Sequence, residues 1–322
     1  MRSMPAPRVL FVKLSSLGDV VHHFPAVTDL AAHLPGVEVA WAVEEGYADL
    51  VRLHPAVREV VPVGLRALRS RPFRGAEWRR FTGARRELRA GSWDYVIDTQ
   101  GLVKSAWVAR QARGPRFGPD RASAREKLAA RQYDVGIAVP RGLHAVERNR
   151  LLVAGVFGYA LPLPADYGLS APPIRPSFAP PGPYAVFLHA ASRADKRWPE
   201  ERWIALGRRL SERGLGVALP GGTAAERQSA ARIASAVPGA VALPPLGLRE
   251  IAALLGHAWL AVGVDTGLTH LAVALDRPTV GLYCATRPEL TGLHGERCLS
   301  LGGPGAPPAV ETVAEAIGDP FR

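Results

Sequence analysis

Short apolar runs alternate with helix-like stretches along almost the whole chain, and this alternation constrains the fold more than any other feature. In the first half the predicted strands and helices are, in chain order, residues 8–13, 20–34, 37–43, 95–98 and 102–113. Pro25 is expected to interrupt the first helix. Strands that alternate with helices form parallel sheets with helices on both faces. The sequence therefore predicts an α/β fold with doubly wound sheets.

A proline-rich segment divides the alternation into two parts. Eight prolines fall between residues 160 and 183, which is typical of an interdomain linker. After it the predicted strands and helices are residues 184–189, 199–213, 216–219, 223–236, 259–264 and 268–275. A chain of 322 residues suits two domains of about 150 residues each. We predict an N-terminal domain (1–160), a linker (161–183) and a C-terminal domain (184–322) around a central cleft. Whether the last helix returns to the N-terminal domain is left open.

Positive charge is concentrated in the first half of the chain. Residues 1–160 contain 25 Lys and Arg against 15 Asp and Glu, whereas residues 161–322 contain 15 against 14. This asymmetry predicts that the N-terminal domain meets a polyanion. The alternative is a GC-rich genome, since 36 of the 40 cations are Arg. Nine of them lie between Arg66 and Arg89, a segment predicted to be an amphipathic or loop-like part of the surface.

Several classes of protein are disfavoured by what the sequence lacks. No apolar run approaches the ~18–20 residues of a membrane span, and the N-terminal apolar stretch is too short for a signal peptide. We therefore predict a cytoplasmic protein. Two cysteines give no disulfide framework, and the histidines lack metal-ligand spacing. The usual dinucleotide and P-loop motifs are absent, as is an Asp-x-Asp pair, so neither a cofactor nor a metal ion is expected.

The loop after the first predicted strand is the first candidate site. Ligands of doubly wound sheets bind beyond the carboxyl ends of the strands. Here Lys13 is followed by the hydroxyls of Ser15 and Ser16, by Gly18, which permits close backbone approach, and by Asp19 at the start of a helix. The alternative is that Asp19 only complements the helix dipole.

Two loops of the second half offer further candidates, each with a structural alternative. Lys196 follows the strand predicted at 184–189 and can reach a phosphate as a compact charge, or it is a solvated surface lysine. Thr223 and Glu226 have the spacing of a capping box. Glu226 therefore either caps its helix or accepts hydrogen bonds from a ribose.

The segment from Val264 to His270 is the most informative loop. It follows an apolar run and opens an apolar helix, so the amides of Thr266, Gly267 and Leu268 can hold a pyrophosphate at the helix start. His270 falls in the first turn. The alternative is an N-cap by Asp265 or Thr266 with a core histidine.

Together these loops resemble the lipopolysaccharide heptosyltransferases, in particular the type I enzymes. The resemblance is carried by residues 13–20 (KLSSLGDV), 95–106 (YVIDTQGLVKSA), 144–150 (HAVERNR), 195–199 (DKRWP) and 264–270 (VDTGLTH). It implies a GT-B fold of two Rossmann-like domains. It also implies inverting, metal-independent transfer of L-glycero-D-manno-heptose from ADP-heptose to a Kdo residue of Kdo-lipid A. Such an enzyme works at the inner face of the cytoplasmic membrane as a peripheral protein, and we expect a monomer that binds no nucleic acid.

The resemblance also assigns roles to residues. Asp19 becomes the general base that deprotonates the Kdo hydroxyl. The donor-side residues are Ser192, Lys196, Glu226, Leu246, Asp265, Thr266, Gly267, Leu268 and His270. Among them, Glu226 would hold the ribose and Leu246 would pack on the adenine. The acceptor-side residues are Lys13, Ser15, Ser16, Gly18, Arg66, Arg125, His144 and Arg148.

Two departures from the family pattern and three alternatives accompany this hypothesis. Ala191 stands where a hydroxyl residue is common, and Cys284-Ala-Thr-Arg-Pro replaces the usual Gly-Pro-Thr stretch. A type II heptosyltransferase or an epimerase-like sugar-nucleotide enzyme would share the architecture. A nucleic-acid-binding protein would fit the pI of about 10.3, but the sequence carries no aromatic stacking platform or recognition motif.

Overall fold

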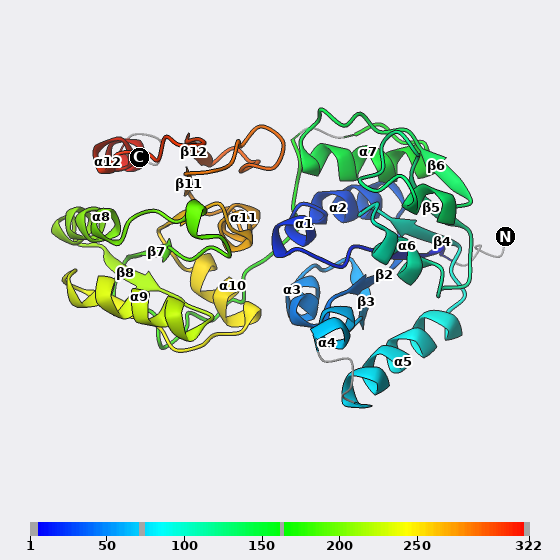
Figure 1. Cartoon of the computed structure of the whole chain (residues 1–322), viewed down its shortest axis with the longest axis horizontal. Helices are drawn as coiled ribbons and strands as arrows, with labels where there is room; N and C mark the ends of the chain where they lie inside the picture. Colours follow the sequence, from blue (N-terminus) through cyan, green and yellow to red (C-terminus); the bar gives the residue numbers. More distant parts are fainter. Residues whose placement is uncertain (1–5, 71–74, 162–163, 319–322) are drawn as a thin grey trace. The chain divides into compact units, whose positions relative to one another are not determined.

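The chain folds into two compact units, each built around its own parallel sheet (Figure 1). The computed structural model describes residues 6–70, 75–161 and 164–318 and divides into Met1–Gly168 and Leu169–Arg322. Each unit has six parallel strands with helices packed on the sheet, so the predicted pair of doubly wound α/β sheets is confirmed. The division falls inside the proline-rich segment, and the described residues between Phe157 and Tyr184 form neither helix nor strand.

In unit 1 (Met1–Gly168) the strand order is β3-β2-β1-β4-β5-β6. The strands are β1 (Arg8–Val12), β2 (Glu38–Val43), β3 (Val57–Pro62), β4 (Tyr95–Asp98), β5 (Arg116–Pro119) and β6 (Val135–Ile137). The helices are α1 (Leu17–Val21), α2 (Phe24–His33), α3 (Ala48–Val51), α4 (Leu65–Ser70), α5 (Gly75–Ala90), α6 (Val103–Ala109) and α7 (Ala145–Phe157), with 3₁₀ turns η1 (Glu45–Tyr47) and η2 (Ala129–Gln132). The order reverses between β1 and β4, and such a switch point is where ligands bind.

Two local predictions in unit 1 gain detail from the structure. The predicted helix over 20–34 breaks at His22 and His23, and Pro25 then lies in the first turn of α2, where its missing N–H costs no helical bond. The arginine-rich segment forms α4 and α5 within the described residues, with 71–74 outside them. In α5, Phe81, Ala84 and Leu88 are buried at helical spacing.

In unit 2 (Leu169–Arg322) the strand order is β12-β11-β10-β7-β8-β9. The strands are β7 (Tyr184–Leu188), β8 (Gly216–Leu219), β9 (Ala240–Ala242), β10 (Leu260–Val264), β11 (Thr279–Tyr283) and β12 (Cys298–Gly302). The helices are α8 (Glu200–Glu212), α9 (Ala224–Ser235), α10 (Leu248–Gly256), α11 (Gly267–Ala274) and α12 (Val310–Gly318), with the 3₁₀ turn η3 (Ala194–Lys196). Here the order reverses between β7 and β10.

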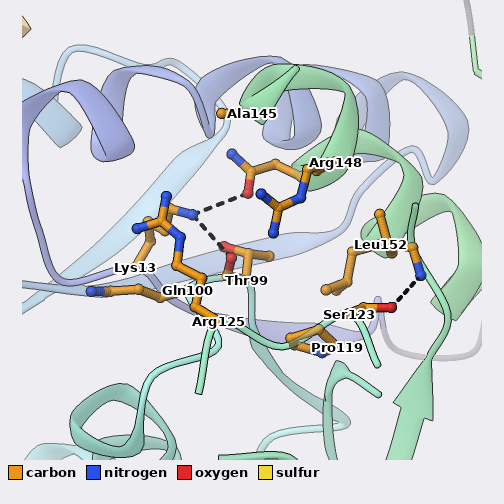
Figure 2. Close-up of a pocket in the computed structure, with 11 residues that line it drawn as sticks. Lys13, Thr99, Gln100, Pro119, Ser123, Arg125, Ala145, Arg148 and Leu152 are labelled. Atoms are coloured by element: carbon orange, nitrogen blue, oxygen red, sulfur yellow. Dashed lines mark hydrogen bonds between the residues drawn. The ribbon is translucent and has the colours of Figure 1, made fainter. Parts of the chain in front are cut away.

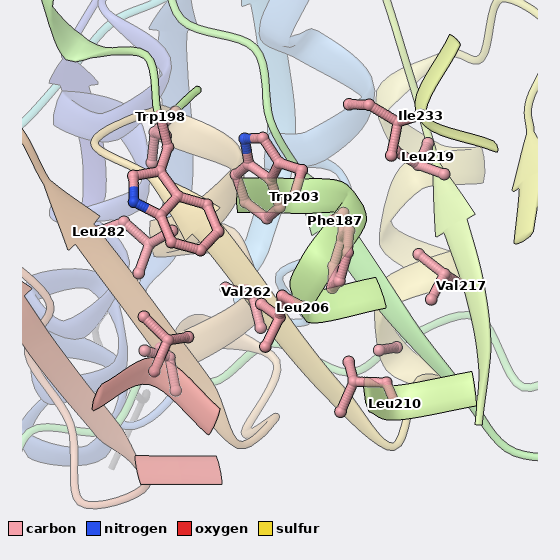
Figure 3. Packing of buried hydrophobic residues seen from close by; sticks show 14 of the residues in the cluster. Phe187, Trp198, Trp203, Leu206, Leu210, Val217, Leu219, Ile233, Val262 and Leu282 are labelled. Carbon is pink, nitrogen blue, oxygen red and sulfur yellow. The ribbon is translucent and has the colours of Figure 1, made fainter. Parts of the chain in front are cut away.

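The core of unit 2 explains where the last helix lies. Trp198, Trp203 and Phe187 pack with aliphatic side chains of the sheet and of α8, as Figure 3 shows. Helix α12 buries Val313 and Ile317 in the same cluster and contacts α8 and β11. The apolar face of α12 therefore completes the core of unit 2. None of the described helices is long and apolar enough to cross a membrane.

Candidate active site

Lys13 lies at the switch point of unit 1, where the loops after β1 and β4 meet. Its Nζ donates to the backbone oxygen of Thr99 at 2.9 Å and to Oδ1 of Asn149 on α7 at 3.0 Å. The side chain is only 3% exposed, and burial lowers the pKa of Lys13 to about 8. An ammonium has three donors. Two of them are used inside unit 1, which leaves one for a ligand.

Asp19 lies in the first turn of α1, close to this lysine. Its carboxylate accepts hydrogen bonds from the backbone N (3.1 Å) and Oγ (3.2 Å) of Ser16 and pairs with Nη2 of Arg125 at 2.7 Å. Burial raises the pKa of Asp19. The charges of Lys13 and Arg125 and the hydrogen bonds from Arg125 and Ser16 outweigh burial and hold that pKa below its usual range. Asp19 is therefore ionised at neutral pH and 18% exposed, so it can accept a proton.

Three cationic side chains line one pocket of unit 1. The head groups of Lys13, Arg125 and Arg148 lie close together in Figure 2. The cavity is about 20 Å³, room for about one water molecule. Nε of Arg148 is buried and has no hydrogen-bond partner among the described residues. Burial, followed by the charges of Arg125 and Arg141, lowers the pKa of Arg148. A carboxylate or phosphate of a ligand would satisfy such a group through charge-assisted hydrogen bonds.

The other predicted acceptor-side residues fall into two groups. Ser15 accepts a hydrogen bond from Nζ of Lys104 at 3.0 Å, and both line a second pocket together with Arg66. Lys104 was missed as a site residue, although it lies inside the quoted segment 95–106. His144 instead caps α7, where its Nδ1 accepts from the amide of Val146 at 3.2 Å. Gly18 lies within α1, one residue before Asp19.

Unit 2 brings Lys196 and Asp265 together at its own switch point. Nζ of Lys196 lies 2.7 Å from Oδ2 of Asp265, and Oγ1 of Thr286 donates to the same oxygen at 2.6 Å. Nε2 of His270 lies 3.9 Å from Oδ1. Burial raises the pKa of Asp265, but His270, Lys196 and Thr286 outweigh burial and hold it far below its usual range. Thr286 was missed by the sequence analysis, and it lies in the segment that departs from the family pattern.

The start of α11 lies directly after this ion pair. Thr266 occupies the N-cap position with extended backbone but makes no side-chain cap, and Asp265 bonds to Lys196 and Thr286 instead. The alternative is thus met in part: Thr266 stands at the N-cap position without the side-chain bond, and His270 is buried. The first amides of a helix lack an intrahelical acceptor. Those of Gly267 and Leu268 can therefore donate to an anion, and Asp265, two residues before Gly267, pairs with Lys196.

The remaining donor-side predictions lie in the loops after β7 and β9 and, for Glu226, in the first turn of α9. Oε2 of Glu226 accepts from the amides of Gly222 (2.9 Å) and Thr223 (3.0 Å), while Oγ1 of Thr223 accepts from the amide of Glu226 (3.2 Å). The capping box is thus formed, and the ribose contact of Glu226 stays a prediction. Ser192 is exposed after β7, and Leu246 is half-buried between β9 and α10.

Comparisons with known proteins identify the relatives of this chain. Residues 81–314 match the model of glycosyltransferase family 9 (heptosyltransferase). Lipopolysaccharide heptosyltransferase 1 of Pseudomonas aeruginosa is 47% identical over 300 residues, which cover 92% of this chain and 83% of that protein.

Two solved structures of one enzyme support the same relationship. The E. coli heptosyltransferase WaaC with ADP superposes with a TM-score of 0.92 and 40% identity, covering 97% of this chain and 99% of that one. WaaC with ADP-2-deoxy-2-fluoro heptose gives a TM-score of 0.86 and 40% identity, covering 97% and 98%. Both the sequence and the two-sheet architecture therefore agree with these relatives.

Proposed function

Because the chain belongs to glycosyltransferase family 9 and is a GT-B lipopolysaccharide heptosyltransferase of type I, we propose a specific transfer reaction. L-glycero-D-manno-heptose passes from ADP-heptose to a Kdo residue of Kdo-lipid A. The transfer inverts the anomeric configuration and needs no metal ion. The observation that carries the proposal is Asp19, an ionised carboxylate surrounded by cations at the switch point of unit 1. The donor part is supported by WaaC, whose structures contain ADP and an ADP-heptose analogue.

Asp19 acts as the general base. It takes the proton from the attacking Kdo hydroxyl, the freed oxygen bonds to the anomeric carbon of heptose, and the bond from that carbon to the diphosphate breaks, releasing ADP. In the free protein the cations make Asp19 a weak base, because they depress its pKa. An anionic acceptor that binds Arg125, Arg148 and Lys13 would neutralise their charge and raise that pKa. Acceptor binding thus makes the base stronger when it is needed.

The donor diphosphate binds at the start of α11. The amides of Gly267 and Leu268 and the ammonium of Lys196 stabilise the charge that develops on the leaving ADP. Asp265 orients Lys196, with Thr286 on the same carboxylate oxygen. Ser192 adds a hydroxyl, and the loops with Glu226 and Leu246 take the ribose and the adenine. Since protein cations and amides supply this stabilisation and the sequence has no Asp-x-Asp pair, no divalent ion is required.

Inversion fits the distribution of these groups between the units. The attacking oxygen and the leaving diphosphate must stand on opposite faces of the anomeric carbon. The chain carries the base in unit 1 and the diphosphate site in unit 2, on separate sheets. A base and a diphosphate site that belong to different units suit a reaction in which attack and departure use separate groups.

The acceptor is an anionic glycolipid. Kdo has a carboxylate and lipid A has phosphates, and both are matched by bidentate arginines such as Arg125 and Arg148. The same reasoning explains why the net charge of residues 1–160 is +10. Because lipid A is anchored in a bilayer, the protein works as a peripheral protein at the inner face of the cytoplasmic membrane.

A transfer assay tests the proposal directly. The protein is incubated with ADP-heptose and Kdo-lipid A in the presence of EDTA, and product mass and anomeric configuration are measured by mass spectrometry and NMR. We expect one added heptose with inverted configuration. Consumption of ADP-heptose without a new glycolipid would contradict transfer, loss of activity in EDTA would contradict metal independence, and retained configuration would contradict the mechanism.

A further inference from the structure

A second and larger pocket of unit 1 begins at the catalytic loop. Its volume is about 850 Å³, within the range of pockets that hold small ligands. It is lined by Ser15, Glu44, Leu65, Arg66, Leu68, Leu102, Val103, Lys104, Trp107 and Glu126. Ser15 lies four residues before Asp19, so the pocket continues from the place where the acceptor hydroxyl must be activated. The mechanism proposed above does not use its apolar part.

Trp107 is the most unusual side chain of this pocket. Its indole is 43% exposed although it lies in the middle of a helix. It stacks on Phe81 of α5 with ring centroids 5.2 Å apart and an interplanar angle of 14°. Because Phe81 is buried, the stack fixes the indole at the surface. A fixed and exposed aromatic ring is a platform for a flat, partly apolar ligand.

The polar groups around Trp107 have complementary hydrogen-bonding chemistry. Lys104 is one helical turn before Trp107 on the exposed face of α6, and its Nζ reaches Ser15. Neither Lys104 nor Arg66 makes an ion pair within the described ranges. The two carboxylates are bound to helix-start amides, Glu44 to that of Arg66 and Glu126 to that of Val103. Cationic donors and carboxylate acceptors around an aromatic ring suit the hydroxyls and ring face of a sugar.

We propose that this pocket is a second acceptor subsite, which holds the sugar bonded to the one that accepts heptose and uses Trp107 as the platform for its ring. The inference rests on the proposed function, because it takes the acceptor to be a chain of sugars. Lys104 links the two subsites, since it contacts Ser15 of the catalytic loop and lines the same pocket as Trp107. The neighbouring sugar would thus position the reacting hydroxyl at Asp19.

The test compares acceptors that differ by one sugar. Heptose transfer is measured for Kdo methyl glycoside, for a Kdo disaccharide and for fully deacylated Kdo-lipid A, which carries glucosamine as the neighbouring sugar. We expect kcat/KM of the wild type to be higher for at least one longer acceptor, whichever neighbour the pocket holds. Trp107→Ala should reduce that gain in kcat/KM about tenfold, which is the effect of losing one apolar contact on substrate discrimination. Activity on the methyl glycoside should stay unchanged.

Two further variants separate the subsite from a structural effect. Trp107→Phe keeps an aromatic ring and should retain most of the gain, whereas Trp259→Ala, which removes another exposed tryptophan outside the pocket, should leave all three acceptors unaffected. The inference is overturned if Trp107→Ala lowers kcat/KM equally for every acceptor or if the gain survives it. A wild type that transfers heptose to none of the acceptors would instead contradict the proposed function.

Discussion

The two switch points share one topology but hold their charged groups differently. In unit 1, Lys13 is bound by neutral oxygens of Thr99 and Asn149, and Asp19 pairs with Arg125 from another loop. In unit 2, lysine and carboxylate pair directly, as Lys196 and Asp265 at 2.7 Å. Both carboxylates accept hydrogen bonds, and the difference lies in the cation: Asp19 pairs with an arginine, whereas Asp265 pairs with the lysine itself.

This difference suits the two functions proposed for the two units. Asp265 is held by Lys196 and Thr286 and lies near His270, which fits the proposed role of orienting groups that bind an anion. Asp19 faces Lys13, Arg125 and Arg148, so it lies in an excess of positive charge that an anionic acceptor can reduce. Catalysis and nucleotide binding should therefore be separable by mutation, one at each switch point.

The largest effect should follow from removing the unit 1 carboxylate. Asp19→Ala deletes the proposed base, and a positioned base contributes about 10²–10⁴-fold in rate. We expect kcat to fall by at least about 10²-fold in the transfer assay. Affinity for ADP, measured by calorimetry, should stay unchanged because the proposed nucleotide site lies in unit 2. Unchanged turnover would remove Asp19 from its role, and a parallel loss of ADP affinity would show that the two switch points are not separable.

The converse variant acts at unit 2. Lys196→Ala removes a hydrogen-bonding charge worth about 1.5–3 kcal/mol, so the Kd for ADP should rise about 10–100-fold. Lys104→Ala is the matched control, since it removes a lysine from unit 1 and should leave the Kd unchanged. Equal ADP affinity of Lys196→Ala and the wild type would refute the phosphate contact.

A pH profile sharpens the comparison, because burial lowers the pKa of Lys13 to about 8. Below that pH the lysine is charged and supports binding of the anionic acceptor. Above it the charge is lost. We expect kcat/KM of the wild type to fall several-fold as pH rises through about 8, with the decline shifted upward in Lys13→Arg because a guanidinium stays charged. Lys127→Arg, at an exposed lysine, should keep the wild-type profile. Coincident profiles of the wild type and Lys13→Arg would exclude Lys13 as the titrating group.

The sequence predicted the strand-end loops well because each follows an apolar run that forms a central strand, as β1, β7 and β10 do. It missed β3, β5, β6, β9, β11 and β12. Most of these are short or contain charged residues, glycine or proline, whereas β11 is a fully buried strand that the sequence analysis overlooked. Sheet pairing, which only the fold supplies, stabilises these strands.

The contacts within the sites were predictable only in part. Asn149 binds Lys13 across 136 residues of sequence, and no periodicity indicates such a partner. Thr286 and Lys104 were missed for the same reason, since each gains its partner from an element far away in the chain. Residue type and strand-end position identify which groups carry the chemistry. Tertiary packing decides which of them meet.

The smallest effect concerns Glu226, where the formed capping box and the predicted ribose contact compete as explanations. Glu226→Gln keeps a capping-box residue, so its melting temperature should match the wild type, whereas Glu226→Ala should lose about 0.5–2 kcal/mol, or a few degrees. If the carboxylate also binds ribose, Glu226→Gln should weaken ADP binding several-fold but leave pyrophosphate binding unchanged. If Glu226→Gln binds ADP as tightly as the wild type does, the role of Glu226 is purely structural. Nucleotide binding in unit 2 would then depend on the diphosphate site at α11, with Asp265 as the carboxylate that organises it.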